Sequence, residues 1–244
     1  MKEEKKRIIK KYIFIFFVLF IVLTSVFIMI KYQVEGEKNM PYELEQIVIK
    51  SSIGGLDLED GNNWNIQLAQ YNDIYINIKP SENKENEEKI EKVYIENIEI
   101  TGKVAKENLS IHLPTGNTIS DIYENSTKNY INEKIEFLGN TADSLSRHEI
   151  CADGGMIAFR IINDKIGNYK SEEKEIIYNG KLLKKAGINE EDLQLNLKFD
   201  IVIEVSSGIK YKSTLEYKLP VEKFEESSSK TKVIEDFSNT IFKR

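Results

Sequence analysis

Histidine and cysteine come close together at one place in the chain, the run His148-Glu149-Ile150-Cys151-Ala152. Its first residues begin like a zinc-protease helix, but position 152 is alanine where that motif needs a second histidine. With two histidines in the whole chain, a zinc site would need carboxylates or the cysteine as further ligands. His148 and Cys151 could instead pair as base and nucleophile, although such neighbours are common by chance.

Acidic and glycine-rich turns are the other candidates. The run 57–63 (DLEDGNN) has the composition of a calcium loop, but glycine falls at its fifth position and Leu68 stands where the bidentate glutamate belongs. Asp153-Gly154-Gly155 lacks the GK[ST] of a phosphate loop, so we predict a turn before a strand. Forty acidic residues leave paired carboxylates for glycoside hydrolysis open, but no pair stands out. We therefore predict no catalytic, cofactor-binding or metal residue, and no cofactor.

An apolar segment near the N-terminus gives a stronger signal. Tyr12 to Ile30 contains nineteen residues without a charge, and as a helix it spans roughly 28 Å, close to the thickness of a hydrocarbon core. It is longer than the apolar part of a cleaved signal peptide, and no small-residue cleavage site follows it. We predict an uncleaved transmembrane helix that binds the protein to the membrane.

Charge is distributed unevenly around this helix. The head, residues 1–11, carries six cations against two glutamates, and cations on that side predict a cytoplasmic N-terminus and a translocated C-terminal domain. The chain has a net charge of −6; the head carries +4 and Lys31 +1, so the remainder carries −11. Because nucleic acids are bound through Lys and Arg, this acidic remainder argues against a nucleic-acid partner. The one cysteine, Cys151, allows no disulfide within the chain.

Alternating apolar residues predict strands in the rest of the chain. The clearest is 194–205 (QLNLKFDIVIEV), followed by a turn at 206–208 and a returning strand over 209–219. Further strands are predicted at 44–49, 64–78, 90–100, 109–113 and 156–162. Helical patterns cover 119–131, weakly, and Lys181 to Ala186, where Gly187 would cap the helix. Trp64 is expected in the core.

Many short strands with few helices predict a mainly β protein: an antiparallel, Ig-like β-sandwich, or two small sandwiches. We expect a basic head at 1–11, a transmembrane helix at 12–30, a juxtamembrane linker at 31–41, a β-rich domain at 42–224 and a mobile tail at 225–244. The polar run 81–89 is expected to be a hairpin loop, with a domain linker as the alternative. Apolar residues in 233–242 could dock as a strand or short helix.

The chain resembles a group of uncharacterised single-pass, membrane-anchored surface proteins of low-GC Gram-positive, clostridial-type bacteria. The resemblance rests on the Lys-rich head, one helix, the run KYQVEGEKNMPYELEQIVI, the later runs FRIINDKIGNY and IIYNGKLLKKAGI, and the final IFKR. It covers nearly the whole chain. It implies a cell-surface β-sandwich and supplies no activity, ligand or catalytic residue.

These observations favour a membrane-tethered extracytoplasmic module that binds another envelope protein or a wall component. The alternative is a cell-envelope hydrolase with two carboxylates, which would need a pocket holding them about 5–10 Å apart with a raised pKa. A third hypothesis is a member of a secretion or division complex that uses the helix itself as its contact.

Overall fold

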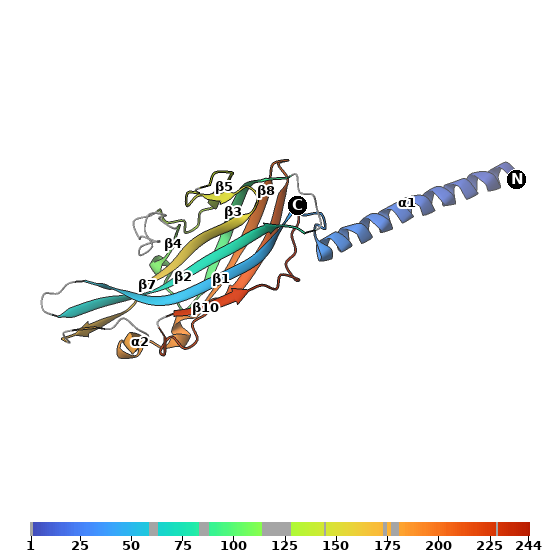
Figure 1. The fold of residues 1–244 in the computed structure, drawn as a ribbon. Coiled ribbons are helices and arrows are strands. Elements are labelled where there is room, and N and C mark those ends of the chain that lie inside the picture. The colour runs from blue at the N-terminus through green and yellow to red at the C-terminus, as the bar shows by residue number, and fades with distance from the viewer. Residues whose placement is uncertain are drawn as a thin grey trace.

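The structure is a computed structural model. It describes residues 2–58, 63–82, 88–113, 128–143, 145–172, 175–176, 181–227 and 229–244. A long N-terminal helix, α1, joins one end of an elongated β domain (Figure 1). The chain therefore has the mainly β architecture with an N-terminal apolar helix that the sequence predicts.

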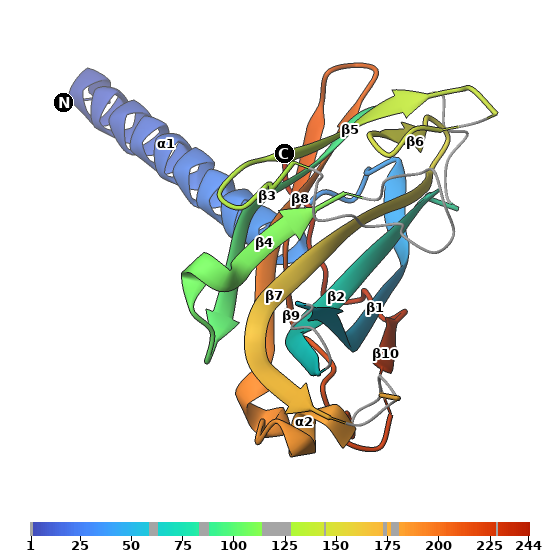
Figure 2. The same cartoon turned by 90° about the vertical axis from the view of Figure 1, so that its left-hand side faces the viewer.

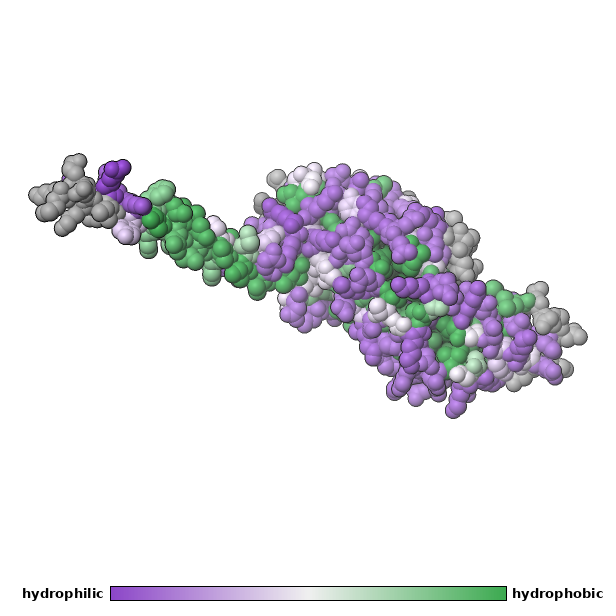
Figure 3. Space-filling model, turned by 180° about the vertical axis from the view of Figure 1, so that it is seen from behind, coloured by the Kyte–Doolittle hydropathy of each residue, from purple (hydrophilic) through white to green (hydrophobic). Residues whose placement is uncertain are grey.

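Helix α1 (Lys2–Glu35) is longer at both ends than the predicted span of 12–30. Within it, Lys10–Glu35 is long and apolar enough to cross a membrane, and none of its most apolar window is buried against the described chain. Figure 3 shows this contrast, with hydrophobic surface along the helix and a mostly hydrophilic β domain. The expected linker at 31–41 is wrong in its first half, because the helix continues to Glu35 and ends at Gly36, whose φ of +69° suits glycine.

The described strands form two five-stranded sheets that pack face to face (Figures 1 and 2). The first sheet has the order β10-β1-β2-β7-β4 and is antiparallel throughout; its strands are β1 (Tyr42–Asp57), β2 (Trp64–Pro80), β4 (Leu109–His112), β7 (Gly155–Ser171) and β10 (Ser229–Ile234). The second has the order β6-β5-β3-β8-β9 and comprises β3 (Ile90–Gly102), β5 (Ile135–Asn140), β6 (Glu149–Cys151), β8 (Leu195–Val205) and β9 (Lys210–Lys218). Only the β5–β6 pair among them is parallel.

The strand order is that of an immunoglobulin sandwich. Strands β1, β2, β7 and β4 occupy the places of A, B, E and D, and β3, β8 and β9 those of C, F and G. Strands β5, β6 and β10 are additions at the sheet margins. Strands β2 and β3 belong to different sheets, so they do not form the hairpin that the sequence favours around residues 81–89, of which 83–87 lie outside the described residues.

Both sheets contribute to one main core. On β8 the six alternating residues from Leu195 to Val205 are fully buried, as predicted. Phe159 of β7 meets Phe199 of β8 edge to face, with ring centroids 5.8 Å apart. The main core contains residues from both sheets, so the β domain is one sandwich and not two.

Strands β1, β2 and β7 extend beyond the main core, away from α1 (Figure 1). Two smaller apolar clusters lie at this distal end, formed with α2 (Lys181–Lys185) and the 3₁₀ helix Glu190–Leu193. Helix α2 and the φ of +69° at Gly187 confirm the predicted helical turn. Trp64 is only partly buried, beside the cluster of Ile66, Leu68 and Leu182, so its prediction as a residue of the sandwich core is wrong.

Two further predictions concern residues 119–131 and 225–244. The weak helix at 119–131 lies largely outside the described residues, and residues 128–131 within it are not helical. The segment 225–244, expected to be a mobile tail, contributes β10 (Ser229–Ile234) to the first sheet. The apolar run 233–242 overlaps this strand only at Val233 and Ile234, and beyond it Phe237 and Phe242 pack against the main core without forming the strand or short helix that the sequence allows.

Candidate functional site

His148 and Cys151 lie at opposite ends of the short strand β6 (Glu149–Cys151). His148 lies in the turn before β6, with its ring 6.4 Å from that of Tyr130, and Cys151 ends β6 half-buried. The carboxylate between them, Glu149, accepts hydrogen bonds from the Ser146 amide (2.7 Å) and the Asn140 side chain (2.8 Å). These bonds, chiefly the one from the Ser146 backbone, lower the pKa of Glu149. Glu149 thus stabilises the loop before β6 as an ionised acceptor.

The two predicted turns, at 153–155 and 57–63, both adjoin strands of the first sheet. Asp153 and Gly154 form a tight turn, with a φ of +105° at Gly154, and β7 follows at Gly155 as predicted. Residues 59–62 of the calcium-like run lie outside the described residues; before them, Asp57 accepts a hydrogen bond from the Asn65 amide (3.3 Å). No group of three or more His, Cys, Asp or Glu suited to a metal ion occurs within the described part of the chain.

Several carboxyl groups of the β domain have a lowered pKa, which favours their ionised form. Wherever the described carboxyls of the β domain have a clearly shifted pKa, the shift is downward: Glu88, Glu149, Asp192, Asp200, Glu204 and Asp236. Hydrogen-bond donors cause these shifts, because they stabilise the charged form. A general acid for glycoside hydrolysis needs the opposite shift, so these six groups do not favour the hydrolase hypothesis.

Charged side chains on the outer face of the second sheet neutralise one another. Asp200, which is 8% exposed, accepts hydrogen bonds from Asn97 (2.7 Å) and Thr214 (2.5 Å) and pairs with Lys212 (2.8 Å). Beside it, Tyr94 donates to Glu204 at 2.5 Å. A hollow of about 250 Å³ lies over these groups, but its cations are largely paired with carboxylates, so it offers no strong field for an anion.

A row of polar side chains is buried inside the first sheet, where alternation would place apolar residues. Ser51 donates to the side-chain amide oxygen of Asn72 (2.7 Å), which also accepts from Gln70 (3.3 Å), and Asn163 donates to the side-chain oxygen of Gln70 (3.3 Å). All four are at most 4% exposed. The row lies between the main core and the distal clusters, and its mutual hydrogen bonds remove most of the cost of burying amides.

A hollow of about 590 Å³ lies at the helix-proximal end of the β domain. Its walls are the residues around the end of α1, the start of β1 and the segment after β10, and six of the lining side chains are acidic: Glu35, Glu37, Glu43, Glu45, Glu235 and Asp236. Most of these have partners, including Lys38 for Glu35 (2.6 Å) and Gln46 for Glu235 (2.8 Å). The hollow is wide and polar, and its acidic side chains lie at the junction between the helix and the sandwich.

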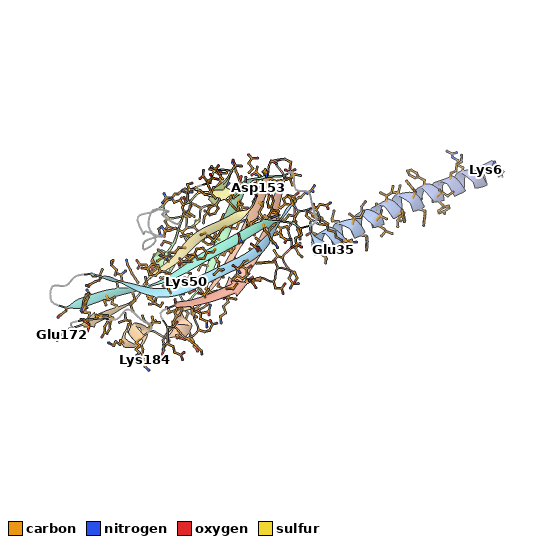
Figure 4. All side chains as sticks on the ribbon, in the orientation of Figure 1. Lys6, Glu35, Lys50, Asp153, Glu172 and Lys184 are labelled. Atoms are coloured by element: carbon orange, nitrogen blue, oxygen red, sulfur yellow. The ribbon has the colours of Figure 1, made fainter. Side chains whose placement is uncertain are left out.

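The opposite, distal end differs in character. Glu172 and Lys184 lie there, at the end of the β domain farthest from Glu35 (Figure 4). Close to the end of β1, Leu56 and Leu58 are 61% and 45% exposed. Two neighbouring exposed leucines are a candidate contact surface, although Met156 and Val233 elsewhere on the β domain are also more than half exposed.

These features define a class, an Ig-type β-sandwich carried on an apolar N-terminal helix. The chain matches no protein-family model, and neither the curated proteins nor the solved structures contain a match to it.

Proposed function

We propose that this chain is a single-pass membrane protein that displays its sandwich outside the cytoplasm as a binding module for another envelope protein. The observation that carries the proposal is the unburied apolar window of Lys10–Glu35, which water would solvate poorly and lipid would solvate well. The cationic head before this window supports a cytoplasmic N-terminus. The resemblance to clostridial-type surface proteins stays a prediction that agrees with this location.

The distal end is the proposed contact surface. It is the part of the domain farthest from the bilayer when α1 is inserted, and it presents Leu56 and Leu58 to solvent. A protein partner suits exposed leucines, whereas an acidic domain with a charge of −11 after residue 31 suits neither nucleic acid nor other polyanions.

Protease accessibility tests the topology. Protease added to cells whose wall has been removed should digest the sandwich and leave a fragment containing the head and α1. Protection of the sandwich until the membrane is permeabilised would overturn the proposed location.

Site-specific photo-crosslinking tests the contact surface. A benzoylphenylalanine at position 56 should give a discrete adduct in intact cells, and the adduct should disappear when Leu58 is changed to Asp. The matched control places the same group at Lys198, which is exposed on the second sheet. Equal adducts at both positions, or none at position 56, would contradict a distal contact surface.

A further inference from the structure

The segment after β10 returns across the sandwich to the end of α1. We call residues 235–244 the C-terminal strap. From β10 at the edge of the first sheet it runs to β9 at the edge of the second, where Lys243 and Lys212 exchange two backbone hydrogen bonds of 2.8 and 2.9 Å. Phe237 and Phe242 of the strap pack, partly buried, against the main core. The strap thus joins the two sheets along one side.

The same strap also bonds to the end of the helix. The Arg244 amide donates to the Tyr32 hydroxyl (2.7 Å), and the Lys243 ammonium donates to the Gln33 side chain (2.7 Å). Just past the helix, the Glu37 amide donates to the Phe242 carbonyl (2.7 Å), and the Glu37 carboxylate pairs with Arg244 (2.8 Å). Glu37 retains only 13% side-chain exposure, so this ion pair is partly shielded from water.

Close packing at Gly36 holds the strap against the helix cap. The Gly36 amide donates to the Tyr32 carbonyl (2.8 Å), which closes the last turn of α1. A Cβ atom at Gly36 would lie 2.5 Å from Ile241 Cγ2 and 2.6 Å from the Phe242 carbonyl oxygen. No side chain fits between helix and strap, so the contact is direct.

We infer that the strap fixes the direction of α1 relative to the sandwich. Apart from the strap, α1 connects to β1 only through residues 36–41, a short segment whose dihedral angles could absorb a swing of the whole domain. The strap, which is attached to both sheets, adds bonds to Tyr32 and Gln33 on the helix and to Glu37 within the hinge itself. The inference concerns the geometry of helix and sandwich, and it holds whichever partner the distal end binds.

Distance measurement between spin labels tests the inference on the full chain in detergent micelles. With Cys151 changed to Ser, labels at Met29→Cys on α1 and Glu216→Cys on β9 report the angle between helix and sandwich; both positions are exposed. The parent should give one narrow distance distribution. Deleting residues 235–244 should broaden it, whereas Asn239→Ala, an exposed position within the strap, should leave it narrow.

A second variant separates loss of orientation from loss of folding. Tyr32→Phe with Glu37→Gln removes a hydroxyl and a charge from the helix side and leaves the bonds between Lys243 and Lys212 in place. It should broaden the distribution while the near-UV circular dichroism of the sandwich is unchanged. A narrow distribution in this variant, or a broad one in the parent, would overturn the inference.

Discussion

Replacing Asn72 by alanine should destabilise the sandwich far more than its polar character suggests. Asn72 is fully buried, accepts hydrogen bonds from Ser51 and Gln70, and donates to the Ile161 carbonyl (3.4 Å). Alanine leaves two buried donors without this acceptor, and each such group costs about 1–3 kcal/mol. Because a water molecule could enter the space and recover part of that, we expect a loss of roughly 3 kcal/mol in the free energy of unfolding.

A double-mutant cycle shows whether the row acts as a unit. Ser51→Ala removes one donor and leaves Asn72 bonded to Gln70, so it should cost about 1 kcal/mol. Once Asn72 is alanine, the Ser51 hydroxyl has lost its acceptor, and removing it should cost nothing further or restore stability. The coupling between the two positions should therefore be about 1–2 kcal/mol.

Urea unfolding in detergent micelles measures these differences. Trp64, the one tryptophan of the sequence, reports the distal cluster by fluorescence, and near-UV circular dichroism of the tyrosines reports the rest. Coincident transitions support a two-state analysis. The control Leu56→Ala, at an exposed position, should change stability by less than about 0.5 kcal/mol. Additive effects in the cycle, or an Asn72→Ala variant as stable as the parent, would refute the reasoning.

Three further predictions concern single sites. Burial alone would raise the pKa of Asp200, but hydrogen bonds, including that from Lys212, outweigh burial and lower the pKa. Asp200 therefore stabilises the fold above its unfolded pKa of about 3.9, and this contribution is lost as pH falls below that value. Asp200→Asn should flatten the acid limb of a plot of the urea midpoint against pH. Burial raises the pKa of Tyr42 to about 12. The contribution of Tyr42 to the free energy of unfolding is therefore complete below its unfolded pKa of about 10 and disappears as pH rises toward 12. Tyr42→Phe should remove one late-titrating group from the tyrosinate absorbance at 295 nm. Gly139→Ala should cost about 3 kcal/mol or more, because its Cβ would meet the Ile90 carbonyl oxygen, and a thermal melt that matches the parent would contradict this.

Hydrophobic alternation predicted the strands whose inward residues are all apolar. Strand β8 is the best case, because each alternate residue from Leu195 to Val205 enters the core. Strand β7 was predicted only as far as Ile162, since the run NDKIGNYKS that continues it is polar. That continuation pairs with β2 over Trp64–Leu68. The pairing gives hydrogen-bond partners to backbone N–H and C=O groups in a segment whose polar side chains do not predict a strand.

The buried polar row explains why alternation predicts β1 only over 44–49, whereas the strand runs over Tyr42–Asp57; β2, predicted over 64–78, runs over Trp64–Pro80. Ser51 and Asn72 occupy inward positions, so a pattern search ends or weakens the strands there. Polar residues can be buried at these positions because they hydrogen-bond to one another: Ser51 and Gln70 both donate to Asn72. The sequence alone does not show that these side chains meet. Strands β5 and β6 escape prediction for a simpler reason: at six and three residues they are too short for an alternating pattern to stand out.

The sequence signal at His148 depends on neighbouring residues, whereas the contacts at the junction of helix and sandwich depend on residues far apart in the chain. Motif spacing excluded a zinc helix at His148 because one alanine replaces a needed histidine, and that argument is local. The strap contacts are not local, since Arg244 bonds to Tyr32, 212 residues earlier in the chain. Nothing in the run IFKR marks it as a helix cap. Its role follows only from the order of the two sheets, which places β10 and β9 on the same side and leaves the last residues beside the helix from which the domain begins. Contacts between the strap and the end of α1 restrain the hinge most effectively, because they join segments about 200 residues apart and close the β domain around residues 36–41.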